Sequence, residues 1–152
     1  MLYQDANLKI DVSLDRIEKN VKKAQFYLDN QVMNSMIPYM PMRTGSFINL
    51  TRAKSSAYAG TGRVYAGVSP MGRYLYEGKV MVNVATGKGA FPLKDGNGNV
   101  IGFRYPRGAK LQSTTRPLIY SRASATPRWF DTAKAQHKNQ WVSGVKKIIG
   151  GK

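Results

Sequence analysis

The sequence predicts an α+β fold: a long N-terminal helix, an antiparallel β-sheet of about four to five strands with a projecting arm, and a C-terminal helix. Apolar residues recur at three- and four-residue steps near both ends of the chain, whereas strand-like runs and turn signals fill the middle. Helices that flank a run of strands are typical of α+β folds, and we expect both helices on one face of the sheet. The length of 152 residues indicates a single domain.

The first predicted element is a helix of about six turns. Ser13 is its candidate N-cap, and Asp15 and Glu18 fall in the first turn, where the helix dipole favours acidic residues. Residues 8–13 alternate apolar and polar and could form a short strand or lead-in. Asp29 lies off the apolar stripe. We expect the stripe to face the core; its members are Leu14, Ile17, Val21, Ala24, Leu28, Val32 and Met36.

A corner rich in proline follows this helix. Because proline lacks an amide hydrogen and the residue before it avoids helical geometry, the helix should end at Met36 or Ile37. A glycine at the end of the corner permits a backbone conformation that other residues avoid. We expect a structural hinge here rather than a binding site; the corner residues are Pro38, Pro41, Thr44 and Gly45.

Several segments after the corner have the character of strands. Residues 46–58 and 63–69 are expected to form a β-hairpin around the turn signal at 59–62. Residues 73–85 supply aromatic side chains and then another strand. The run 117–121 is expected to return to the sheet as a further strand.

Residues 86–117 differ from the rest, with six glycines, six basic residues, one acid and few apolar side chains. We interpret them as a projecting arm, with a small hairpin that turns at residues 95–98, because a loop this long is uncommon without a function. We expect the arm to be mobile in the free subunit and ordered in an assembly. Its candidate interface or DNA-facing residues are Lys88, Lys94, Arg104, Arg107, Lys110 and Arg116.

The last predicted element is a helix that begins near Thr126. Thr126 is a plausible N-cap and Pro127 occupies the first helical position, where proline is favoured. Gly150 and Gly151 end the helix. Its apolar face is formed by Phe130, Ala133, His137, Trp141, Val145 and Ile148.

The net charge of +16 is concentrated in the middle of the chain. Residues 1–30 are neutral, with five basic and five acidic residues, whereas residues 43–128 carry fourteen basic residues and two acids. A basic surface implies phosphate or an acidic protein as its partner. The sequence contains no helix-turn-helix pattern, zinc-ligand spacing or aromatic RNA-binding signature that would choose between them.

The chain offers few groups for catalysis. The chain has no cysteine, and His137 is its only histidine. A zinc site built on histidines is therefore excluded, and a Ser-His-Asp triad would have to use His137. Glu77 and Asp95 are far apart in the sequence. We therefore expect no enzyme activity, no cofactor and no metal. No apolar run approaches the roughly 18 residues of a membrane span, and no signal peptide is expected.

Two glycine-containing segments resemble ligand-binding loops without meeting their requirements. Residues 85–91 resemble a phosphate loop, but Lys88 is followed by Gly89 instead of serine or threonine, and no helix is expected behind it. Residues 95–100 resemble the start of a calcium loop, but Val100 occupies the position of its glycine. We interpret both as turns.

Four segments, in this order, resemble the minor capsid protein family of tailed phages of Gram-positive hosts, which is similar in plan to the tail-completion proteins of lambda-like phages. The segments are PYMPMRTGSFINLT, GVSPMGRYLYEGKVMV, PLIYS and ATPRWFDTAKAQHKNQWVSGVKK. The run from Tyr74 to Gly78 and the pair Trp129 and Phe130 match well. Arg43 stands where the wider group usually has an aspartate before its Thr-Gly corner.

The resemblance implies a head–tail joining role: a subunit of a homo-oligomeric ring in the phage neck, made in the host cytoplasm and located at the head–tail junction of the virion. Its partners would be other neck proteins (a connector or adaptor, a tail terminator or the tail tube), with packaged DNA as a further contact and no membrane. Candidate interface aromatics are Tyr74, Tyr76 and Trp129. The alternative function is a basic nucleic-acid-binding protein without enzymatic activity; an unrecognised hydrolase ranks third.

Overall fold

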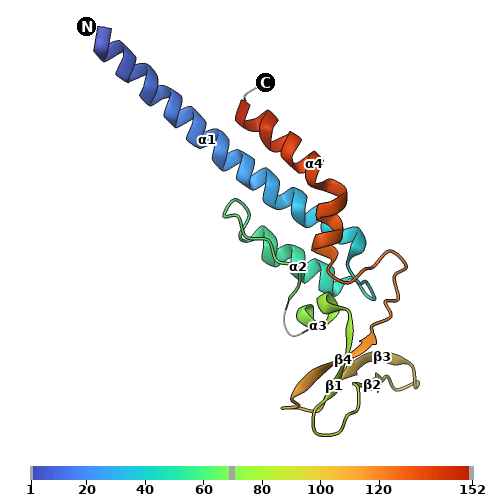
Figure 1. The fold of residues 1–152 in the computed structure, drawn as a ribbon. Helices are drawn as coiled ribbons and strands as arrows, with labels where there is room; N and C mark the ends of the chain where they lie inside the picture. Colours follow the sequence, from blue (N-terminus) through green and yellow to red (C-terminus); the bar gives the residue numbers. More distant parts are fainter. Residues whose placement is uncertain (1, 69–70, 151–152) are drawn as a thin grey trace.

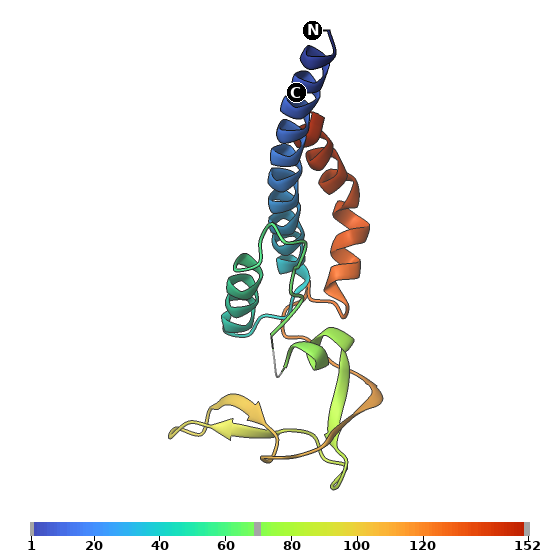
Figure 2. The ribbon, with the colours of Figure 1, turned by 90° about the vertical axis from the view of Figure 1, so that its left-hand side faces the viewer.

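Two long helices and four short strands occupy opposite ends of an elongated molecule (Figure 1). The computed structural model describes residues 2–68 and 71–150, with side chains from residue 14 onward. Helix α1 (Leu2–Met36) and helix α4 (Trp129–Gly150) run antiparallel and pack against each other. The α+β class is confirmed. The prediction that both helices pack on one face of the sheet is wrong, because they cover each other and the strands lie beyond one end of the pair (Figure 2).

The strands form two separate two-stranded sheets instead of one larger sheet (Figure 2). Strand β1 (Lys79–Asn83) pairs antiparallel with β4 (Leu111–Pro117). Strand β2 (Phe91–Lys94) pairs antiparallel with β3 (Val100–Arg104), and this hairpin turns at residues 95–98 as predicted. Each sheet therefore has unpaired edges and no second layer of its own.

Helix α1 is longer than the sequence pattern indicated. It begins at Leu2, so Ser13 lies inside the helix, and both the N-cap and the strand over residues 8–13 are wrong. No glycine or proline interrupts residues 2–36, so nothing prevents the helix from extending to its observed start. The predicted end at Met36 is confirmed, and a short 3₁₀ turn, η1 (Ile37–Tyr39), follows with Pro38 in its first turn.

The predicted strand over residues 46–58 is wrong, because helix α2 (Ser46–Ser56) occupies this segment. Its buried residues Ile48, Thr51 and Ser55 follow a helical spacing, which shows that packing against the helical core outweighed the strand-like composition. Within the described range 63–68, the predicted partner strand is also absent.

The segment after α2 is held by side-chain hydrogen bonds and not by the strand pairing of the expected hairpin. The Ser55 hydroxyl accepts from the Tyr65 amide at 3.0 Å and lies 3.3 Å from the Tyr65 carbonyl oxygen. The turn at 59–62 is confirmed, and it docks on Asp29, which is 5% exposed. The Asp29 carboxylate accepts from the amides of Gly60 at 2.7 Å and Gly62 at 3.0 Å. A polar residue off the apolar stripe thus joins α1 to this turn.

Helix α4 begins two residues later than its predicted first residue. Arg128 has a positive φ of 49°, which is outside helical geometry, and its carbonyl accepts from the amides of Asp131 and Thr132. The Thr126 hydroxyl lies 3.1 Å from the hydroxyl of Thr132, so the simple N-cap at Thr126 is wrong. The predicted apolar face is confirmed, since Ala133 and Trp141 are buried.

The α1–α4 contact depends on close approach and on one polar bridge. Gly144 of α4 lies directly against the ring of Tyr27 on α1, where a Cβ atom would collide with the phenol. The Trp141 Nε1–H donates to the Ser35 hydroxyl at 3.1 Å. These contacts hold the last third of α1 against the middle and second half of α4.

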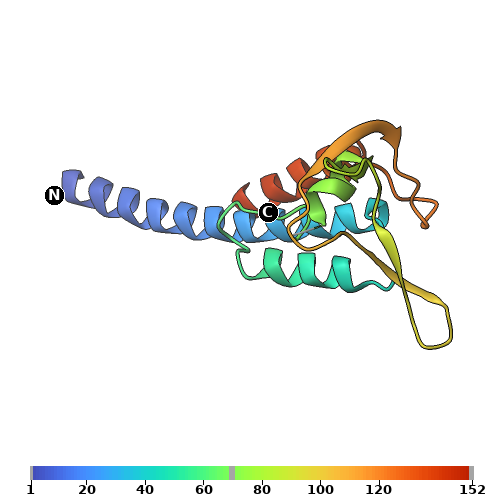
Figure 3. The ribbon, with the colours of Figure 1, turned by 90° about the horizontal axis from the view of Figure 1, so that it is seen from below.

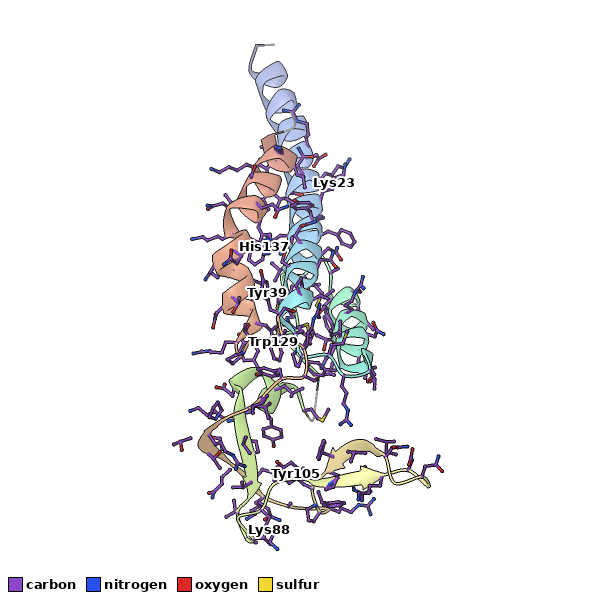
Figure 4. All side chains as sticks on the ribbon, turned by 90° about the vertical axis from the view of Figure 1, so that its right-hand side faces the viewer. Lys23, Tyr39, Lys88, Tyr105, Trp129 and His137 are labelled. Carbon is purple, nitrogen blue, oxygen red and sulfur yellow. The ribbon has the colours of Figure 1, made fainter. Side chains whose placement is uncertain are left out.

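The core lies where the helices meet the aromatic segment of α3 (Gly72–Glu77). Trp129 is completely buried, and its ring meets those of Tyr76 at 4.9 Å and Phe47 at 6.1 Å between centroids, both edge to face. Its Nε1–H donates to the Ala66 carbonyl at 2.8 Å. Figure 4 shows Trp129 at the base of α4, between the helical end and the strands.

Gly45 offers a test of the corner. Its φ is 82°, and a Cβ atom added there would meet nothing within 4 Å, so replacement by alanine should cost backbone strain alone. We expect Gly45→Ala to lower the free energy of unfolding by about 1 kcal/mol. Gly96→Ala is the matched control, because Gly96 has equally open space without a positive φ. Equal urea midpoints for the two variants would contradict the strain.

Candidate functional site

The candidate functional surface is the arm, residues 86–117, at the end of the molecule opposite the α1 N-terminus (Figure 2). It contains the β2–β3 hairpin and then β4. The predicted strand at 117–121 is wrong: the ladder ends at Pro117, which has no amide hydrogen to donate, and residues 118–121 run back toward the helical core without strand structure. The strand that pairs with β1 is thus β4, which lies inside the predicted arm instead of after it.

All of the arm's predicted basic residues are exposed, namely Lys88, Lys94, Arg104, Arg107, Lys110 and Arg116. Among the described side chains, the one ion pair is between Arg128 and Asp131, at 3.3 Å and outside the arm. The arm's charges are therefore free to act on a partner. Figure 4 places Lys88 at the far end of the molecule from the helices.

Side-chain hydrogen bonds tie the arm to the rest of the molecule, among them one donated to its backbone by Arg43 and one donated from the arm to strand β1 by Tyr105. Arg43 Nη2 donates to the Val100 carbonyl at 2.9 Å, and the guanidinium lies 5.4 Å from the ring centroid of Phe103. The Tyr105 hydroxyl donates to the Met81 carbonyl at 2.7 Å, and burial raises the pKa of this phenol. Arg43, just before the Thr-Gly corner, thus reaches the arm.

The corner at residues 38–45 is held by the segment that leads into α4. Arg122 Nη1 donates to the Ile37 carbonyl at 2.9 Å, and the Ser124 hydroxyl donates to the Pro38 carbonyl at 2.7 Å. The Thr126 amide donates to the Tyr39 carbonyl at 3.0 Å. These bonds engage the three carbonyls of the 3₁₀ turn η1, which favours a structural role for the corner.

The predicted interface aromatics occupy different environments. Trp129 is fully buried, so its proposed role as an exposed anchor is wrong; the indole is needed inside the core. Tyr76 packs on it, and burial together with the nearby Asp131 raises the pKa of the Tyr76 phenol. Tyr74 is half-buried. An aromatic at the start of a helix does not by itself reveal which way it faces.

The sequence reasoning missed a set of exposed apolar residues on the arm. Phe91, Ile101 and Phe103 expose 45%, 62% and 58% of their surface on the β2–β3 hairpin. The short apolar runs in these strands were visible in the sequence, but nothing there showed that no second layer would cover them. Exposed aromatic and aliphatic groups beside cations are typical of protein interfaces.

The described residues contain no cluster of three or more histidine or acidic side chains that could hold a metal ion. His137 lies half-buried on α4, with its ring 6.4 Å from that of Tyr39 between centroids. Among the helices of the described part of the chain, none is long and apolar enough to cross a membrane.

Comparison of the chain with protein-family models, curated proteins and solved structures finds no match. The family resemblance therefore stays a prediction that depends on the four sequence segments.

The tether between body and arm can be tested by hydrogen exchange. Removal of the guanidinium in Arg43→Ala should raise exchange across residues 91–104 about tenfold, because one charge-assisted hydrogen bond is lost. Arg52→Ala is the matched control: it removes the same charge from an exposed position on α2. Equal exchange in the two variants would show that Arg43 does not restrain the arm.

The arm's turn should depend on pH through Asp95. Its carboxylate accepts from the Asn99 amide at 2.8 Å and the Asn97 amide at 2.9 Å, and these bonds hold its pKa below the ordinary value of 3.8. The stabilisation is complete above that value and is lost as the pH falls through the lower folded pKa. The amide NMR signals of Asn97 and Asn99 should therefore move in this acid range. In Asp95→Asn, which keeps an acceptor without the titration, they should stay in place; identical titrations would refute the assignment.

Proposed function

We propose that this chain is a structural virion protein of a tailed bacteriophage, a subunit of a homo-oligomeric ring in the neck that joins head to tail. The observation that carries the proposal is the meeting of the resembling segments. Three of the four segments contribute residues to the core cluster around Trp129. The fourth, residues 117–121, is joined to the second by the Tyr120 hydroxyl, which donates to the Leu75 carbonyl at 2.6 Å. Proteins that share an assembly fold would keep the residues that pack this junction, whereas proteins that share a reaction would keep catalytic residues. The resembling motifs are of the first kind.

The contacts at this junction are specific. The Arg128 amide donates to the Tyr76 carbonyl at 2.7 Å, and the ring of Tyr76 packs against Trp129. Gly78, with a φ of 66°, lies directly against Pro127, so that no side chain fits between them. A tyrosine-rich segment, a glycine and an aromatic-led helix are therefore all required for the same packing.

The distribution of charge supports a subunit that docks on another surface. The arm carries its cations at one end of an elongated body, and its exposed apolar residues lie beside them. An acidic ring surface of a neck protein would be attracted over a distance before contact, and the apolar groups would then be buried. The partners proposed are the adaptor, terminator or tube proteins of the neck.

The same cations also favour the second candidate, a free nucleic-acid-binding protein that uses the arm. The two functions differ in their response to salt. Binding through phosphates alone weakens steeply as salt rises, because released counterions drive it. An apolar contact, once made, is much less sensitive to salt.

Charge reversal in the arm tests the proposed function. In the double variant Arg104→Glu, Arg107→Glu, purified subunits should join unjoined heads and tails about tenfold more slowly, while finished joints stay intact. The control variant Arg52→Glu, Arg63→Glu changes the net charge equally at exposed positions outside the arm and should join at nearly the normal rate.

A salt series gives the complementary measurement. Screening extends to about 10 Å at ~0.1 M salt, so higher salt should slow joining without dissolving finished particles. Joints that fall apart at moderate salt, with an unchanged joining rate, would contradict the proposal that charges act during the approach and apolar groups hold the finished joint. DNA affinity that collapses with salt in a protein that never joins particles would support the nucleic-acid-binding function instead.

A further inference from the structure

The apolar stripe of α1 is covered along only part of its length. Ala24, Val32 and Met36 are buried, whereas Leu14, Ile17 and Val21 expose 51%, 49% and 47% of their surface. These three were expected to face the core, and that prediction is wrong for them.

The reason lies in the lengths of the two helices. Gly144 packs against Tyr27 and α4 ends at Gly150, so α1 before about residue 21 extends beyond α4. Figure 3 shows this projecting part of α1. We call Leu14, Ile17 and Val21 the uncovered stripe.

The uncovered stripe is bordered by acidic charge. Glu18 is exposed, and it lies four residues after Leu14 and three before Val21, which places it along the edge of the stripe. Residues 5–18 contain four acidic and two basic residues, a net charge of −2 in a chain of +16, and Lys19, Lys22 and Lys23 follow them. The acidic group at the stripe is therefore Glu18 itself, and a matching surface should place a basic group beside Glu18 and apolar groups opposite the stripe.

The outer face of α4 has this composition. Val142 and Ile149 expose 42% and 43% of their surface, and their seven-residue spacing places them on one side of the helix. Lys138 and Lys146 are each four residues from Val142, so they flank it on the same exposed side. This outer face lies away from the α4 residues that pack on α1.

We propose that the uncovered stripe of α1 binds the outer face of α4 of a neighbouring copy of this chain. The contact continues the α1–α4 packing that already exists within the subunit, and Glu18 then lies beside Lys138 or Lys146 of the neighbour. Pairing of two uncovered stripes is disfavoured, because Glu18 lies at the edge of the stripe about halfway along it, so that an antiparallel pair of stripes would bring the two Glu18 side chains close together. The inference deepens the proposed ring and rests on it.

The geometry of this contact has a consequence for assembly. Its two surfaces are different, so every copy keeps one free stripe and one free α4 face after binding a neighbour. Such a head-to-tail contact repeats until the rotation closes a ring or continues as a filament. The contact is therefore the kind that a ring subunit requires.

The first test measures self-association of the full-length protein by sedimentation velocity over a concentration series. The wild-type chain should form concentration-dependent oligomers. Ile17→Ser and Val142→Ser should each weaken association about tenfold, because each removes apolar burial from one side of the same contact. Leu50→Ser is the control, since Leu50 is 59% exposed on α2, outside both surfaces. A monomer at every concentration, or equal loss in all three variants, would overturn the proposal.

Charge exchange identifies the two surfaces. Glu18→Lys and the double variant Lys138→Glu, Lys146→Glu should each weaken association, and an equimolar mixture of the two proteins should restore it, because every mixed contact again pairs opposite charges. Association that is unchanged in the double variant would show that the outer face of α4 is not the partner of the stripe and would overturn the proposal. Circular dichroism of each variant confirms that the helices remain intact.

The two proposals can fail separately. If the chain is needed for head–tail joining but Ile17→Ser and Val142→Ser leave self-association unchanged, the contact is refuted and the neck function stands. If self-association depends on both surfaces but joining proceeds without the chain, the contact stands and the neck function is refuted.

Discussion

Burial of Trp129 is the constraint on which the rest of the structure depends. Its indole is the largest fully buried side chain, and it touches residues from the first turn of α2 and from α3 while it begins α4. The hydrogen bond from its Nε1 to Ala66 also fixes the irregular segment after α2. Full burial of such a side chain contributes roughly 2–3 kcal/mol, and its truncation typically costs more. One residue therefore sets the relative positions of four segments.

The two ends of the molecule follow from this central junction. Above it, α1 and α4 bury their facing stripes until α4 ends, which leaves apolar surface on α1 without a partner in the same chain. Below it, two-stranded sheets are held by backbone pairing and by donors such as Arg43 and Tyr105, with little core of their own. Both ends expose groups that a single subunit does not satisfy. Assembly with other subunits would bury these groups, which agrees with the ring-forming function that we propose.

The sequence predicted the helices better than their surroundings. Proline located the end of α1, apolar periodicity located the face of α4, and the turn residues Asp95 to Gly98 located the hairpin, because these features depend on local chemistry. It misread α2 as a strand, since only packing against α1 decides that segment, and it assigned Trp129 to an interface, since a helix-leading aromatic does not reveal its direction. The candidate cations are exposed as expected, whereas the uncovered stripe could not be predicted, because it depends on where α4 stops relative to α1.

The most direct measurement of the proposed function is a cryo-EM map of mature particles of the tailed phage to which the proposal assigns this chain. The account predicts a ring at the head–tail junction in which each subunit places the α1–α4 pair against a neighbour and its arm against an adjoining neck protein. A neck whose density is fully explained by other proteins, with this chain recovered outside the virion, would contradict it.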